Sequence, residues 1–180
     1  FPPLVKNVLT ADARVSSVLV AVFSVGVAIG SVVINAMLKG KVSAKFSPIS
    51  VIAMAVIVVL FSIEVRLWVP AAPGALYDFS SFILQRQAWI VIVTLTAVAI
   101  TGGMFVVPLY AFLTTTVTKD QTARTVAANN IVNAGAMVFG PLFVLALSAA
   151  GITSEDMLLV VAGMCLISAW IAQKLHRACD

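Results

Sequence analysis

Five long stretches without a charged side chain constrain the fold of this sequence more than any other feature. They run over 15–38, 46–63, 87–118, 125–154 and 157–173. All of the Lys, Arg, Asp and Glu residues lie outside them, and such residues form only 10% of the chain. A helix needs about 20 apolar residues to cross a bilayer, and an isolated ion inside the bilayer is costly. The sequence therefore predicts an all-α polytopic membrane protein with five transmembrane helices.

The ends of the five helices follow from caps, charges and helix breakers. We expect helices over about 14–38, 48–69 and 87–114, a fourth that begins near 122, and a fifth that ends near 173. Asp12 stands where it can cap the first helix. Residues 71–86 should form an external loop that lies partly in the membrane interface.

The connections between the spans predict the orientation of the chain. Successive connections alternate between the two sides, and cytoplasmic connections carry an excess of Lys and Arg. One side receives Lys39, Lys41, Lys45, Lys119, Arg124, Lys174 and Arg177, and the other receives Lys6, Arg14, Arg66 and Arg86. The C-terminus should therefore be cytoplasmic and the N-terminus outside.

Several other kinds of function are disfavoured. The basic residues are scattered among the connections, which argues against a nucleic-acid partner. The single histidine, His176, lies in the C-terminal tail, so the chain cannot assemble a His-based metal or catalytic cluster. The spans contain neither a Gly-x-Ser-x-Gly elbow nor paired carboxylates. We therefore expect no enzymatic activity, cofactor or metal.

Glycine and proline mark two places where helices pack or bend. Gly26 and Gly30 are four residues apart, so they share a helix face on which a neighbouring backbone can approach, although the spacing could arise by chance. Gly102, Gly103 and Pro108 interrupt the third span. Because proline removes a backbone donor, we expect this span to bend or unwind there and to act as a gating hinge.

Carboxamide and charged side chains mark the remaining polar positions of the spans. Asn129, Asn130 and Asn133 cluster in the fourth span and need partners at membrane depth. Glu64 and Arg66 are two residues apart on the second span, so they point in different directions. They should reach separately toward the headgroups, and a buried functional charge is the alternative.

Polarity divides the five spans into two groups. The first, third and fourth spans hold the glycines, prolines and asparagines, whereas the second and fifth are almost uniformly aliphatic. We expect the first group to line a cavity and the second to face lipid, which favours a solute transporter.

Three segments resemble bacterial lysophospholipid transporters of the major facilitator superfamily. They are Phe-Pro-Pro-Leu-Val-Lys-Asn-Val-Leu with the later Phe-Ser-Val-Gly-Val-Ala-Ile-Gly-Ser, then Gly-Gly-Met-Phe-Val-Val-Pro-Leu-Tyr at 102–110, and Arg-Thr-Val-Ala-Ala-Asn-Asn-Ile at 124–131. The resemblance implies that residues 1–180 are part of a C-terminal transmembrane domain, with helices eight to twelve of a twelve-helix transporter. The N-terminal half of that transporter would be a missing partner.

The resemblance also implies an activity in the bacterial inner membrane. Members of that family move lysophospholipids, such as 2-acylglycerophosphoethanolamine, to the cytoplasmic leaflet for reacylation, and some are fused to an acyltransferase. An exporter of drugs or small metabolites, or a membrane anchor for a fused acyltransferase, stays an alternative.

If the chain transports lysophospholipids, five residues are candidates for contact with the substrate. Asn129, Asn130 and Asn133 would donate to the head group, Tyr110 would lie near the gate, and Arg124 would meet the phosphate on the cytoplasmic side. The asparagines could equally hold helices together, and Arg124 could be a topology anchor.

Overall fold

The computed structural model describes residues 2–39, 43, 45–72, 75–115 and 117–179, so Lys41 and Phe1 lie outside the described residues. The described chain is helical, with α1 (Pro2–Asn7), α2 (Ala13–Leu38), α3 (Ser47–Arg66), α4 (Phe79–Leu84), α5 (Arg86–Thr115), α6 (Lys119–Ala149) and α7 (Ser154–Cys179). Among the described residues, α2, α3, α5, α6 and α7 are long and apolar enough to cross a membrane. The five predicted spans are thus confirmed as helices, and their length and composition are those of a multi-pass membrane protein.

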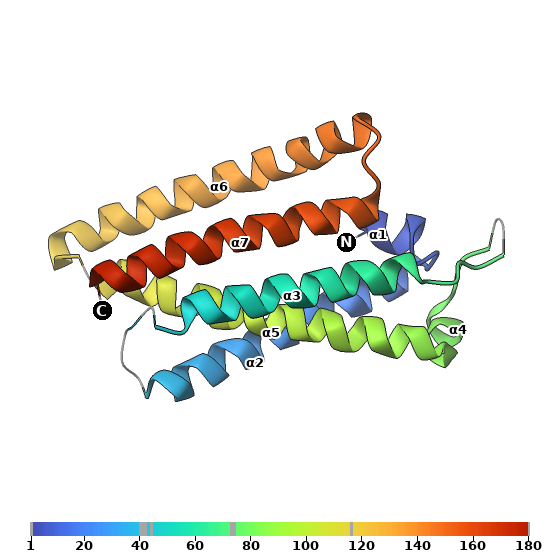
Figure 1. Cartoon of the computed structure of the whole chain (residues 1–180), viewed down its shortest axis with the longest axis horizontal. Coiled ribbons are helices and arrows are strands. Elements are labelled where there is room, and N and C mark those ends of the chain that lie inside the picture. The colour runs from blue at the N-terminus through green and yellow to red at the C-terminus, as the bar shows by residue number, and fades with distance from the viewer. Residues whose placement is uncertain (1, 40–42, 44, 73–74, 116, 180) are drawn as a thin grey trace.

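Successive long helices run in opposite directions, so the molecule has two ends, at the left and right of the view (Figure 1). We call the end where α2, α5 and α7 finish and α3 and α6 begin the basic end, because Lys39, Lys45 and Lys174 lie there. The other end, where α2, α5 and α7 begin, is called the opposite end. The bundle of α2, α3, α5 and α7 is packed together, and α6 stands beside it with few contacts (Figure 1).

Glycines hold α2 and α5 unusually close. A Cβ atom added at Gly26 would lie 2.6 Å from the Ala99 Cβ, and one added at Gly30 would lie 2.0 Å from the Ile100 carbonyl oxygen. From the α5 side, a Cβ added at Gly103 would lie 2.5 Å from the Val27 carbonyl oxygen. These distances leave no room for a side chain, so the two backbones are in direct van der Waals contact, as small residues permit in membranes.

A stripe of small and medium side chains makes α3 the most buried of the long helices. It packs against both α5 and α7. On one side Val51 and Ala55 meet Cys165 and Ala169 of α7 in a buried cluster. Nearer the opposite end, the buried Ser62 hydroxyl donates to the Glu155 backbone oxygen of α7 at 3.1 Å.

The opposite end is closed by two short helices that the sequence did not predict. The Asp12 N–H donates to the Tyr77 carbonyl at 3.0 Å, and the Tyr77 N–H donates to the Thr10 carbonyl at 2.7 Å. The Trp68 ring lies 5.5 Å from the Phe82 ring of α4 in a buried apolar cluster that also includes residues of α1 and α2. The expected loop 71–86 thus contains the helix α4 (Phe79–Leu84), which packs in this cluster through Phe82.

Two expectations about individual helices have clear outcomes. Asp12 caps α2 as expected, because its Oδ1 accepts from the Val15 N–H at 2.9 Å. Of the bend or unwinding expected for the third span, the unwinding is absent, since α5 stays helical through Gly102, Gly103 and Pro108. Both Gly103 and Pro108 are buried, so neighbouring helices support the backbone where proline removes one donor.

The division by polarity does not describe the packing within the chain. The aliphatic second span, α3, has the largest buried share of the five helices, whereas no described residue of α6, the asparagine-bearing fourth span, is buried. Burial in the membrane follows side-chain size more than polarity, because lipid is as apolar as leucine and only close packing favours helix contact. Small residues on α3 and α7 therefore decide which faces meet.

Candidate functional site

A pocket at the basic end brings together three of the five candidate contact residues. Tyr110 of α5 and Asn129 and Asn133 of α6 line a volume of about 460 Å³. The other walls are apolar side chains of α5, the α5–α6 connection and α7, namely Val106, Leu109, Phe112, Leu113, Val117 and Leu175. The pocket thus combines two carboxamides and a phenol with apolar walls, which is the usual composition of a site for an organic ligand.

Helical geometry explains which polar residues of α6 reach this pocket. Successive residues on a helix are rotated by about 100°, so Asn129 and Asn133 differ by only about 40°. Asn130 points about 100° away from Asn129 and is exposed outside the pocket. The structure therefore separates Asn130 from the two asparagines with which the sequence grouped it.

Arg124 also lies apart from the pocket. It precedes Asn133 by nine residues, which places it on the other side of α6, and its side chain is exposed. Arg124 could contact a ligand held by Asn129 and Asn133 only if α6 rotated or moved relative to the other helices. Its position near the start of α6 at the basic end fits the topology-anchor alternative.

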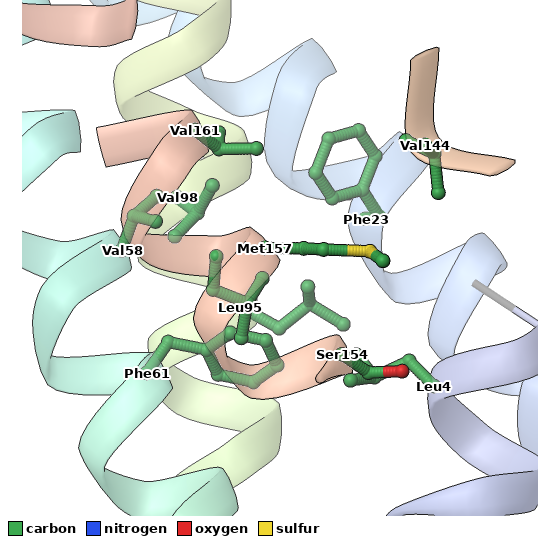
Figure 2. A pocket seen from close by; sticks show the side chains of 11 residues that line it. Leu4, Phe23, Val58, Phe61, Leu95, Val98, Val144, Ser154, Met157 and Val161 are labelled. Carbon is green, nitrogen blue, oxygen red and sulfur yellow. The ribbon is translucent and has the colours of Figure 1, made fainter. Parts of the chain in front are cut away.

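A second cavity, of about 330 Å³, lies toward the opposite end (Figure 2). Phe23 of α2, Leu95 of α5 and Met157 of α7 line its centre, and the Met157 side chain points toward Phe23. Val144 of α6 closes one side, and Ser154 is the only polar residue in the lining. This cavity offers apolar contact and almost no hydrogen bonding.

No family model, curated protein or solved structure matches the chain. Over the described residues, no three His, Cys, Asp or Glu side chains gather as metal ligands would. What the two cavities offer is neutral hydrogen bonding at one end and apolar surface at the other.

None of the candidate hinge and packing residues is in the lining of either pocket, although Pro108 directly precedes Leu109 of the pocket at the basic end. Gly26, Gly30 and Gly103 are in the contact between α2 and α5, and Pro108 is buried further along α5. Gly102 has more room, since the nearest atom to an added Cβ is the Met54 sulfur at 3.6 Å. The structure thus gives Gly103 a packing role and leaves Gly102 as the freer of the two.

Charged side chains at the opposite end have partners that the sequence could not assign. Arg66 of α3 forms an ion pair with Asp156 of α7. Glu64 of α3 accepts a hydrogen bond from the Thr94 hydroxyl of α5 at 2.8 Å. Glu64 and Arg66 do point to different neighbours, as their spacing indicates, but they tie helices together and do not only reach toward headgroups.

The apolar cavity was missed by the sequence reasoning for a simple reason. Phe23, Leu95 and Met157 look like any other apolar residues of a membrane span, and no local spacing marks them. Only the packing of six helices, α1, α2, α3, α5, α6 and α7, around one space distinguishes them. Polar residues, in contrast, stand out in an apolar span, which is why Asn129 and Asn133 could be found.

Proposed function

We propose that this chain is part of a secondary transporter that moves lysophospholipids across the bacterial inner membrane, with its C-terminus in the cytoplasm. The basic end is then the cytoplasmic end, in keeping with the excess of Lys and Arg there. The long helices α2, α3, α5, α6 and α7 would be helices eight to twelve of a major facilitator superfamily transporter. The activity of the chain would be transport and not catalysis.

The single observation that supports this proposal is the pocket of Tyr110, Asn129 and Asn133. A lysophospholipid has one polar head and one acyl chain, so its site needs a few hydrogen-bond donors beside an apolar surface. Carboxamides exposed at membrane depth are costly unless protein, water or a polar ligand satisfies them. Two such side chains on one face of α6, opposite a phenol, fit a transported polar head.

Transport of labelled lysophosphatidylethanolamine tests the proposal. The whole gene is expressed in spheroplasts of a strain that lacks its own lysophospholipid transporter, and uptake is compared with that of cells carrying an empty vector. We expect uptake above the vector level. Asn129→Ala with Asn133→Ala should lower it by roughly tenfold or more, because hydrogen bonds to charged groups contribute about 1.5–3 kcal/mol.

Asn130→Ala is the matched comparison, since it removes the same group from the same helix outside the pocket. It should change uptake far less than the double variant. Uptake no greater than with the empty vector, for protein that is present in the membrane, would contradict the proposal. Export of a cationic dye by the same cells would then favour the drug-exporter alternative.

A further inference from the structure

The two cavities lie beside the same face of α6. Asn133 lines the polar pocket and Val144 lines the apolar cavity, and they are eleven residues apart. Eleven residues bring a helix back to within about 20° of the same direction and advance it by about 16 Å. The polar groups and the apolar cavity therefore line one side of α6 at two heights in the membrane.

The space between the two cavities is open at Gly140. This residue lies seven positions after Asn133, so it faces within about 20° of the same direction. No atom lies within 4 Å of a Cβ added at Gly140. Gly140 therefore places neither a side chain of its own nor a packed neighbour within 4 Å on this face of α6, between the levels of the two cavities.

The dimensions fit one acyl chain. The hydrocarbon core of a bilayer is about 30 Å thick, so the chains of one leaflet extend over about 15 Å. This length is close to the rise of about 16 Å between Asn133 and Val144. Toward the basic end, this face of α6 is bordered by amide and phenol groups, and toward the opposite end almost only by apolar side chains.

We infer that the lysophospholipid lies along this face of α6, with its head between Tyr110, Asn129 and Asn133 and the end of its acyl chain between Phe23 and Met157. The inference rests on the proposed function and adds the orientation of the substrate and a site for its tail. A head at the basic end and a chain that points to the opposite end is the orientation of a lipid in the cytoplasmic leaflet. Since Asn133 lies near the middle of α6 (Lys119–Ala149), the inferred site would hold the lipid in this direction with its head close to mid-membrane depth.

Photo-crosslinking in inner-membrane vesicles tests this orientation. Two lysophosphatidylethanolamines are used, one with a diazirine at the terminal carbon of the chain and one with a diazirine next to the glycerol, and the labelled peptides are mapped. The terminal probe should label the segments around Phe23 and Met157, and the proximal probe should label the segment around Asn133. Excess unlabelled lysophosphatidylethanolamine should remove both signals, because it competes for a specific site. Labelling of the lipid-facing surface of the protein by probe dissolved in the bilayer would not be removed in this way.

Gly140→Leu provides the test of the path. A leucine there would fill the open space, so labelling around Phe23 and Met157 by the terminal probe should fall at least fivefold. Gly135→Leu is the matched control, because Gly135 also has no atom within 4 Å of an added Cβ but points about 140° away from Gly140. It should leave the labelling pattern unchanged, and immunoblots of the membranes check that both variants are inserted.

Several results would overturn the inference without touching the proposed function. One is normal uptake of lysophosphatidylethanolamine together with labelling around Asn133 by the terminal probe and around Phe23 and Met157 by the proximal probe. Others are terminal labelling that excess substrate does not remove, or that Gly140→Leu does not lower. Failure of the proposed function looks different, because the unmodified protein would then show neither uptake nor labelling that excess substrate can remove.

Discussion

Gly30 of α2 and Ile100 of α5 are packed backbone against backbone, since a Cβ atom added at Gly30 would lie 2.0 Å from the Ile100 carbonyl oxygen. Contacts this close leave no space for even a methyl group. They fix the distance between α2 and α5, the two helices that carry Phe23 and Leu95 of the apolar cavity. The cavity therefore depends on a contact that lies outside it.

Gly30→Ala should destabilise the protein through this contact. Overpacking of a tight interface typically costs about 1–3 kcal/mol of the free energy of unfolding. Thermal unfolding in detergent micelles measures the change. Gly163→Ala on α7 is the control, because an added Cβ meets no atom within 4 Å there, and alanine favours a helix over glycine by about 0.5–1 kcal/mol. Equal stability of the two variants would contradict the tight contact.

Gly102→Ala separates a hinge role from a packing role. The nearest atom to its new Cβ is the Met54 sulfur at 3.6 Å, an ordinary contact, so stability should be kept or raised by about 0.5–1 kcal/mol through the helix preference of alanine. If α5 flexes at Gly102 during transport, uptake of lysophosphatidylethanolamine should slow. Gly103→Ala should instead lower the unfolding temperature, because its Cβ meets the Val27 carbonyl oxygen at 2.5 Å. Unchanged uptake by Gly102→Ala would remove Gly102 from the hinge.

The ion pair of Arg66 and Asp156 should contribute little to stability. Both side chains are about half exposed, at 48% and 47%, and such pairs typically contribute about 0.2–1 kcal/mol. A double-mutant cycle with Arg66→Gln and Asp156→Asn measures the coupling through chemical unfolding. The coupling should shrink as salt is raised, because salt screens exposed charges. A coupling that salt does not change would argue that the pair is shielded from water.

Asp78 should make the opposite end sensitive to acid. The hydrogen bond from the Ser81 hydroxyl, followed by the one from the Ser81 N–H, holds the pKa of Asp78 below its usual value of 3.8. A lowered pKa in the folded state stabilises the cap of α4 above pH 3.8, and this stabilisation is lost as the pH falls through the lowered value. Fluorescence of Trp68, which packs on Phe82 of α4, should therefore change at the acid end of a titration.

The reporter for that titration needs Trp89→Phe and Trp170→Phe, so that Trp68 is the remaining tryptophan. Asp78→Asn in the same background is the control, because an amide keeps an acceptor for the cap and does not titrate in this range. Its fluorescence should vary less with pH than that of the parent. An identical acid transition in both proteins would assign the change to another group.

The sequence by itself determined the membrane-spanning character of the chain. The charge-free stretches predicted five helices because an ion in hydrocarbon is costly, and that cost depends on each residue and its depth alone. Asp12 as a cap was equally accessible, since a cap is a local contact within three residues. Asn129 and Asn133 could be selected as site candidates because a polar group stands out in an apolar span.

The tertiary structure decided what these elements contact. Asn129 and Asn133 share a pocket with Tyr110 only because α5 and α6 lie side by side. The partners of Glu64 and Arg66, and the side chains around the cavity of Phe23 and Met157, likewise come from residues far apart in the chain. In a membrane the hydrophobic effect does not choose between apolar faces, so the fit of small side chains such as Gly30 and Ala55 settles the arrangement. That fit is a property of two helices in contact, so it could not be predicted from the sequence of either helix alone.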